Sequence, residues 1–278
     1  MSTTERNKIR VAVIDMNCGK ANQGMRGIQE ILLRYKEEQG VDLAFDIFDI
    51  RVKGEIPDLS YDVYISSGGP GSPYDGEGMK WEQDFFDLLS NIEQHNQNTD
   101  VVKKHAFLIC HSYQLACRKF NVGNVIPRRS TAFGIFPVYL TTEGIAEQVF
   151  TGLKNPFYTV DSRDWQVVNV DDSGNNPYAN VLALEKERPH VDLERCVMAV
   201  RFTNEIIGTQ FHPEADPIGM KMYLMLEEKK QGIIENHGIH KYEDMLSSLD
   251  DDQKLQRTQQ VILPNFINEA VAALQQEA

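Results

Sequence analysis

Long apolar runs are missing from this sequence. No stretch of its 278 residues approaches the length of a membrane-spanning helix, and residues 1–10 are polar rather than signal-like. We therefore expect no transmembrane segment, no signal peptide and no membrane partner. The expected location is cytoplasmic.

Cysteine is also scarce. The chain has four, Cys18, Cys110, Cys117 and Cys196, and they form neither a CxxC pair nor a metal-binding spacing. So few cysteines in so long a chain do not describe a disulfide framework. We expect free thiols, no metal site and no cofactor.

Basic residues are outnumbered, and the formal net charge is −13. A general nucleic-acid-binding protein would be expected to show a basic face, so we expect no nucleic-acid partner. A Walker phosphate-binding loop is absent as well. A reaction that uses ATP would have to take place on another polypeptide.

In the first half of the chain, short apolar segments alternate with amphipathic ones. The expected strands are residues 8–16, 41–50, 61–66 and 106–109, and the expected helices are residues 24–35, 81–94 and 113–120. Strands separated by helices imply right-handed crossovers. The predicted fold class is α/β, with an open, mainly parallel sheet flanked by helices.

The second half is expected to contain an antiparallel β portion and to end in a helical C-terminal extension. The expected strands are residues 134–140, 166–170, 181–184 and 196–202, followed by helix 218–231 and a helix start at 247–252. We divide the chain into a domain of residues 1–232 and an extension of residues 233–278.

An apolar stripe at helical spacing runs along the extension. Its members are Leu263, Phe266, Ile267, Ala270, Val271 and Leu274. We expect this stripe to pack on its own domain. A docking surface, including one for a homo-oligomer, and a lid over the active site are the alternatives.

Cys110 lies at the corner between an expected strand and an expected helix. A helix N-terminus has unpaired N–H groups and the positive end of the helix dipole, which favour a thiolate and can hold an oxyanion. A nucleophile is therefore one interpretation of Cys110. The alternative is a small buried apolar residue, which is the usual role of a free cysteine.

A loop rich in glycine and proline, residues 67–73, follows the third expected strand. Glycines let the main chain come close to a ligand and present bare N–H groups to a carboxylate or an oxyanion. An ordinary turn would have a similar composition.

His212 and Glu214 form the third candidate group. Pro213 pushes His212 into an extended conformation, so the two side chains can project to the same side of the backbone. A carboxylate bonded to one imidazole nitrogen leaves the other nitrogen free to act on a thiol. The alternative is a surface loop with an incidental histidine.

Together and in this order, the GGPGSP loop, the Cys110 corner with Gln114, and the FHPE segment resemble the class I glutamine amidotransferase family. The resemblance covers about residues 8–214. Within the family, this segment is similar to glutaminase domains found with GMP synthase and to stand-alone γ-glutamyl-cleaving relatives. It implies a glutaminase that releases ammonia through a Cys110 thioester. Such an enzyme would act on glutamine or another γ-glutamyl small molecule and would serve a separate synthetase subunit.

The resemblance also implies the role of each residue. Cys110 is the nucleophile, His212 the general base and acid, and Glu214 orients the histidine. The backbone N–H groups of Gly69 and His111 form the oxyanion hole. The remaining substrate-binding residues are Gly68, Pro70, Gly71 and Gln114.

Two glycine positions of the family pattern hold other residues, because Leu108 and Ser112 stand where glycines usually flank the cysteine. His111 also follows the nucleophile where an apolar residue is common. These changes leave open either a reshaped active corner or a site without catalysis. A stand-alone γ-glutamyl hydrolase or transferase and a catalytically silent binding protein therefore remain as alternatives.

Overall fold

The computed structural model describes residues 8–20, 22–171, 174–189, 193–251 and 254–276. Five strands make its parallel half: β1 (Lys8–Asp15), β2 (Asp42–Asp49), β3 (Val63–Ser66), β4 (His105–Ile109) and β9 (Ile206–Thr209). Four more make an antiparallel half: β5 (Asn124–Leu140), β6 (Phe157–Val168), β7 (Asn180–Glu185) and β8 (Val197–Arg201).

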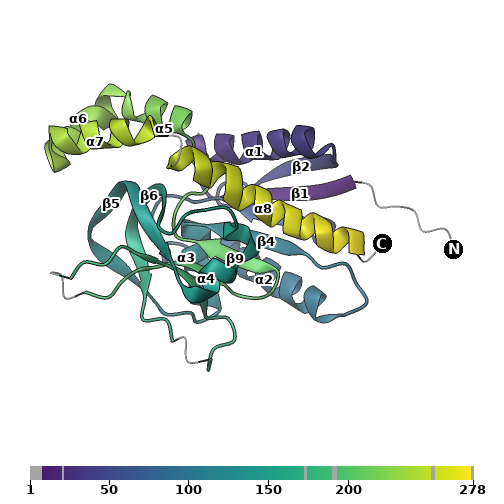
Figure 1. Cartoon of the computed structure of the whole chain (residues 1–278). Coiled ribbons are helices and arrows are strands. Elements are labelled where there is room, and N and C mark those ends of the chain that lie inside the picture. The colour runs from purple at the N-terminus through teal and green to yellow at the C-terminus, as the bar shows by residue number, and fades with distance from the viewer. Residues whose placement is uncertain (1–7, 21, 172–173, 190–192, 252–253, 277–278) are drawn as a thin grey trace.

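All of these strands belong to one sheet. Its order is β2-β1-β3-β4-β9-β8-β7-β5-β6, with parallel pairs from β2 to β9 and antiparallel pairs from β9 to β6. The predicted α/β class, with a parallel part followed by an antiparallel part, is confirmed (Figure 1). β5 and β6 are longer than expected.

Helices cover both faces of the parallel half. The early helices are α1 (Gln23–Gln39), α2 (Lys80–Gln97) and α3 (His111–Lys119), and the short α4 (Thr142–Ala146) and a 3-10 turn (Gln148–Phe150) follow β5. The C-terminal helices are α5 (Pro217–Leu224), α6 (Glu227–His237), α7 (Ile239–Leu249) and α8 (Leu255–Gln276).

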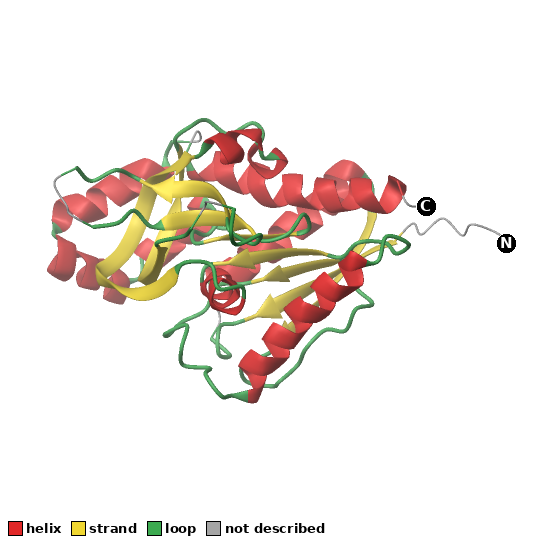
Figure 2. Cartoon of the chain, turned by 90° about the horizontal axis from the view of Figure 1, so that it is seen from below, coloured by secondary structure: helices red, strands yellow, loops and turns green. Residues whose placement is uncertain are grey.

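Side-chain alternation along β1 explains why residues 11–14 of this strand are all apolar. Val11 and Val13 pack in one core with α1 and α8, whereas Ala12 and Ile14 pack in a second core with α2 and α3. A parallel strand covered on both faces has no solvent side for polar residues. Figure 2 shows the sheet between its helices from a second direction.

The C-terminal stripe packs on its own domain, as expected. Leu263, Phe266, Ile267 and Ala270 are fully buried in the core that contains β1 and α1. The Phe266 ring makes an edge contact with Phe107 of β4, with 5.2 Å between the ring centroids. These side chains are therefore not free to bind a second copy. The division at residue 232, which falls inside α6, stays a prediction.

Two expectations for the C-terminal part were wrong. The expected helix 218–231 is two helices, α5 and α6, which are separated at Met225 and Leu226. Within the expected helix start at 247–252, residues 247–249 are instead the end of α7, and the next helix, α8, begins at Leu255; residue 252 lies outside the described residues. None of the helices in the described part of the chain is both long and apolar enough to cross a membrane.

Candidate active site

Cys110 lies on a strained corner between β4 and α3. Its φ of 49° and ψ of −98° are unusual for a residue other than glycine. Two backbone hydrogen bonds hold the corner: the Cys110 N–H donates to the Thr209 carbonyl at 2.7 Å, and the Gln114 N–H donates to the Cys110 carbonyl at 3.0 Å. The corner is thus fixed to β9 on one side and to the first turn of α3 on the other.

The glycine-rich loop after β3 comes against this corner. A Cβ atom on Gly68 would lie 2.7 Å from Cε1 of His212, and one on Gly69 would lie 2.4 Å from the Met16 carbonyl oxygen. Neither position has room for a side chain. Arg51 donates hydrogen bonds to the carbonyls of Met16, at 3.2 Å, and Pro70, at 2.7 Å, and so holds the loop from outside.

Ser112, one of the two departures from the glycines of the family pattern, links the loop to the corner. Its buried hydroxyl donates to the Ser67 carbonyl at 2.7 Å and lies 2.7 Å from the hydroxyl of Ser66, which can donate to it. A glycine could make neither bond. Leu108, the other departure, is buried in the core with α2 and α3. Both side chains therefore have room.

His212 and Glu214 are joined by a hydrogen bond of 2.7 Å between Nδ1 and Oε1. The Glu214 side chain is 1% exposed, and its Oε2 atom has no hydrogen-bond partner among the described residues. Gly27 in α1 makes this burial possible, because a Cβ atom there would lie 2.3 Å from the Glu214 carbonyl oxygen. The sequence did not single out Gly27.

The protonated form of His212 is favoured by its neighbours. Burial acts to lower the pKa of His212, but the charges of Glu214 and Cys110 and the hydrogen bonds to both side chains outweigh burial and hold this pKa well above its ordinary value. His212 therefore interacts with both partners at once, and the group can hold an imidazolium beside a sulfur.

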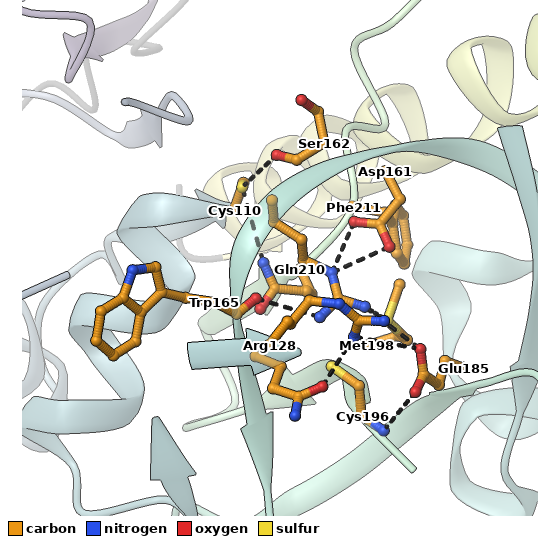
Figure 3. Close-up of polar contacts among 12 residues, drawn as sticks. Cys110, Arg128, Asp161, Ser162, Trp165, Glu185, Cys196, Met198, Gln210 and Phe211 are labelled. Carbon is orange, nitrogen blue, oxygen red and sulfur yellow. Dashed lines mark hydrogen bonds and ion pairs between the residues drawn. The ribbon is translucent and has the colours of Figure 1, made fainter. Parts of the chain in front are cut away.

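Gln210 joins the group from the C-terminal end of β9 and was missed by the sequence. Its Nε2 group lies 3.7 Å from the Cys110 Sγ (Figure 3). Its Oε1 accepts a hydrogen bond of 3.1 Å from Gln114. The Ser162 carbonyl lies 3.9 Å from the same sulfur. Gln210 precedes His212 by two positions, and this spacing was the available signal.

Buried charges from the antiparallel half support this side of the site. The Arg163 side chain, 1% exposed, binds Asp161 at 2.7 Å and Glu185 at 3.5 Å, and Arg128 binds Glu185 at 3.5 Å (Figure 3). In β6, Ser162 lies between Asp161 and Arg163, which both belong to this cluster. The ion pairs therefore help to fix the carbonyl next to Cys110.

A pocket of about 840 Å³ contains most of the predicted site. Every residue assigned from the sequence lines it except His111, whose ring is buried and has no hydrogen-bond partner among the described residues. Burial, with a smaller effect of the Arg51 charge, lowers the pKa of His111 to about 4, so its ring is neutral near pH 7. As the first residue of α3, however, His111 has a backbone N–H without an acceptor in its own helix.

The described residues contain no group of three or more His, Cys, Asp or Glu side chains placed to hold a metal ion. The arrangement instead combines a cysteine at a helix N-terminus, a histidine with a raised pKa and a buried carboxylate. Such a group can perform nucleophilic acyl chemistry with proton transfer.

Comparisons with known proteins give a family match and several solved structures of similar fold. Residues 25–228 match the family described as glutamine amidotransferase class-I. No curated protein matches the sequence. A glutamine amidotransferase from Thermotoga maritima is similar in fold, with 17% identity, a TM-score of 0.66, and 95% of this chain and 98% of that chain covered.

Two further solved structures share the fold. A putative GMP synthase subunit from Thermoplasma acidophilum has 17% identity and a TM-score of 0.56, with 95% of this chain and 94% of that chain covered. The glutaminase domain of Trypanosoma brucei CTPS with bound acivicin has 15% identity and a TM-score of 0.53, with 74% and 86% covered. The family match extends over most of the chain, and the chain belongs to the class I glutamine amidotransferase family.

Proposed function

We propose that this protein hydrolyses the side-chain amide of glutamine and releases ammonia, with Cys110 as nucleophile, His212 as general base and acid, and Glu214 as the group that orients His212. The observation that carries the proposal is the meeting of these three side chains beside one pocket, although they come from two distant parts of the chain.

The proposed reaction has two halves. The Cys110 thiolate adds to the side-chain carbonyl carbon of glutamine, and the resulting oxyanion accepts hydrogen bonds from the N–H groups of Gly69 and His111. The C–N bond then breaks, and His212 gives its proton to the departing ammonia. Water, deprotonated by His212, attacks the thioester, and glutamate leaves as the thiol is restored.

Glutamine binding is assigned to the loop residues Gly68, Pro70 and Gly71 together with Gln114. All four line the pocket. The Gln114 side chain donates to Gln210, whose own amide group lies beside the sulfur, and this relay supports a positioning role for Gln114. The polar contacts of Ser112 and the buried packing of Leu108 favour an active corner over a silent one.

We further propose that a separate synthetase polypeptide consumes the ammonia. The chain has no Walker loop, and one similar structure is a putative GMP synthase subunit. The proposed nucleophile must stay reduced, and its reaction therefore suits the reducing conditions of the cytoplasm.

The test is ammonia release from L-glutamine by the purified chain. We expect measurable turnover, and we expect Cys110→Ala to abolish it. Cys117→Ala is the matched control, because Cys117 is fully buried in α3 and does not line the pocket. Equal turnover by the Cys110→Ala variant would exclude the proposed mechanism.

A further inference from the structure

The pocket extends well beyond the space that a glutamine side chain needs. Pockets of its volume hold whole drug-sized ligands. A group of apolar lining residues from β5, β6, α5 and the α5–α6 junction is here called the apolar wall; its members are Phe133, Val160, Met220, Met222, Tyr223 and Leu226. Phe133 and Tyr223 contact each other, with 5.8 Å between ring centroids.

The apolar wall begins directly beside His212. The His212 N–H donates to the Val160 carbonyl at 3.0 Å, and the two residues form an isolated antiparallel bridge. Val160 belongs to the same apolar cluster as Met220 of α5. α5 starts at Pro217, only a few residues after His212, and Figure 1 shows α5 to α7 gathered over the ends of β5 and β6.

The position of the apolar wall beside His212 decides which part of a substrate contacts the wall. In the proposed reaction His212 protonates the leaving nitrogen, so any group on that nitrogen extends past His212. The groups assigned to the glutamyl part, Gly68 to Gly71 and Gln114, lie on the loop and α3 instead. Ammonia is small and polar and gains nothing from an apolar surface.

We infer that the site accepts γ-glutamyl amides whose nitrogen carries an apolar or aromatic substituent, and this inference rests on the proposed amide hydrolysis by Cys110 and His212, not on the proposed synthetase. The Cys110 sulfur bonds to the γ-carbonyl carbon, the C–N bond breaks, and His212 transfers a proton to the departing amine. Water then hydrolyses the thioester to glutamate. The net reaction is one amide and one water giving glutamate and a free amine.

The exposure of the wall supports a small-molecule substituent as its occupant. Met222 is 56% exposed and Leu226 is 54% exposed, and both line the pocket. A substituent that covers them removes apolar surface from water, and methionine adapts to different shapes. Tyr223 and Phe133 add aromatic faces on which a ring can pack.

The experiment compares kcat/KM for γ-L-glutamylbenzylamide and for L-glutamine with the full chain. Benzylamine and ammonia have similar basicity, so the two leaving groups differ mainly in the benzyl group. We expect kcat/KM for the benzylamide to be at least about tenfold higher. Met222→Glu should lower this preference about fivefold. Ile218→Glu is the control, since Ile218 is 70% exposed on the same helix but does not line the pocket.

Each outcome has one meaning. Turnover of glutamine with equal or poorer turnover of the benzylamide overturns the inference and leaves the proposed function intact. An equal loss of preference in both helix variants also overturns it, because the effect would not come from the pocket. If neither amide is hydrolysed, the proposed function fails with the inference. If a variant does not fold, the ratio of the wild-type kcat/KM values for the benzylamide and for glutamine alone decides whether the inference holds.

Discussion

Replacing Glu214 by glutamine tests the electrostatic part of the site. Glutamine keeps the shape of the side chain and can still accept the hydrogen bond from His212, but it removes the charge. The bond is 2.7 Å long, and the carboxylate is 1% exposed, so solvent screens it little. A hydrogen bond to a charged group contributes about 2 kcal/mol, and its loss corresponds to about a 30-fold decrease in kcat/KM.

The pH profile of kcat/KM shows in which direction Glu214→Gln shifts the pKa of His212. Glu214 is the largest influence that raises the pKa of His212, so Glu214→Gln lowers this pKa. If the reactive form contains protonated His212, the alkaline limb of the kcat/KM profile moves to lower pH, by about 1.5 pH units for 2 kcal/mol. Because the wild-type pKa is raised, the contribution of the pair to stability is present below the ordinary histidine pKa and is lost as pH rises through the raised value.

The assay is ammonia release from glutamine across a pH series, with the free energy of unfolding measured in urea on the same samples. Glu243→Gln is the matched control, because its pair with His240 spans 3.5 Å and both side chains are largely exposed. A Glu214→Gln enzyme with kcat/KM within about threefold of wild type and an unmoved alkaline limb would refute the assigned role of Glu214.

Three further changes test the scaffold by urea denaturation. Ser112→Ala removes the hydroxyl that donates to the Ser67 carbonyl, and we expect a loss of about 1–2 kcal/mol together with slower turnover; unchanged values would mean that this link is dispensable. Arg163→Met leaves the buried Asp161 carboxylate without its arginine and should cost about 3–5 kcal/mol, whereas Lys53→Ala, at an exposed pair with Glu55, should cost under about 1 kcal/mol. Phe266→Ala should cost about 3–5 kcal/mol because the ring is fully buried; a cost under about 1 kcal/mol would show that α8 is not part of the core.

Local sequence patterns were sufficient to predict the parallel half of the sheet and the corner at Cys110. A fully apolar run followed by a helix placed Cys110 correctly at the N-terminus of α3. The glycine-rich loop lies where neighbouring atoms leave no room for a side chain at Gly68 or Gly69. The resemblance to the family then related these segments to His212 and Glu214. Each of these features depends on a few consecutive residues, and such features can be recognised in a single sequence.

Long-range pairings could not be predicted in the same way. Residues 124–133 of β5 include Pro127 and Arg128 and have no apolar alternation, so their strand conformation depends on pairing with β6. Arg163 finds its partner Glu185 on another strand. The break between α5 and α6 lies at Met225 and Leu226, where neither glycine nor proline interrupts the helical pattern.

The most direct test of the central claim is peptide mapping by mass spectrometry after treatment with an electrophilic glutamine analogue. We expect a single adduct at Cys110 that excess glutamine suppresses. Cys18 is the internal control, since it is more exposed but lies outside the pocket, while Cys117 and Cys196 are fully buried. An adduct at Cys18 with Cys110 unmodified would contradict the claim that Cys110 is the nucleophile of a glutamine site.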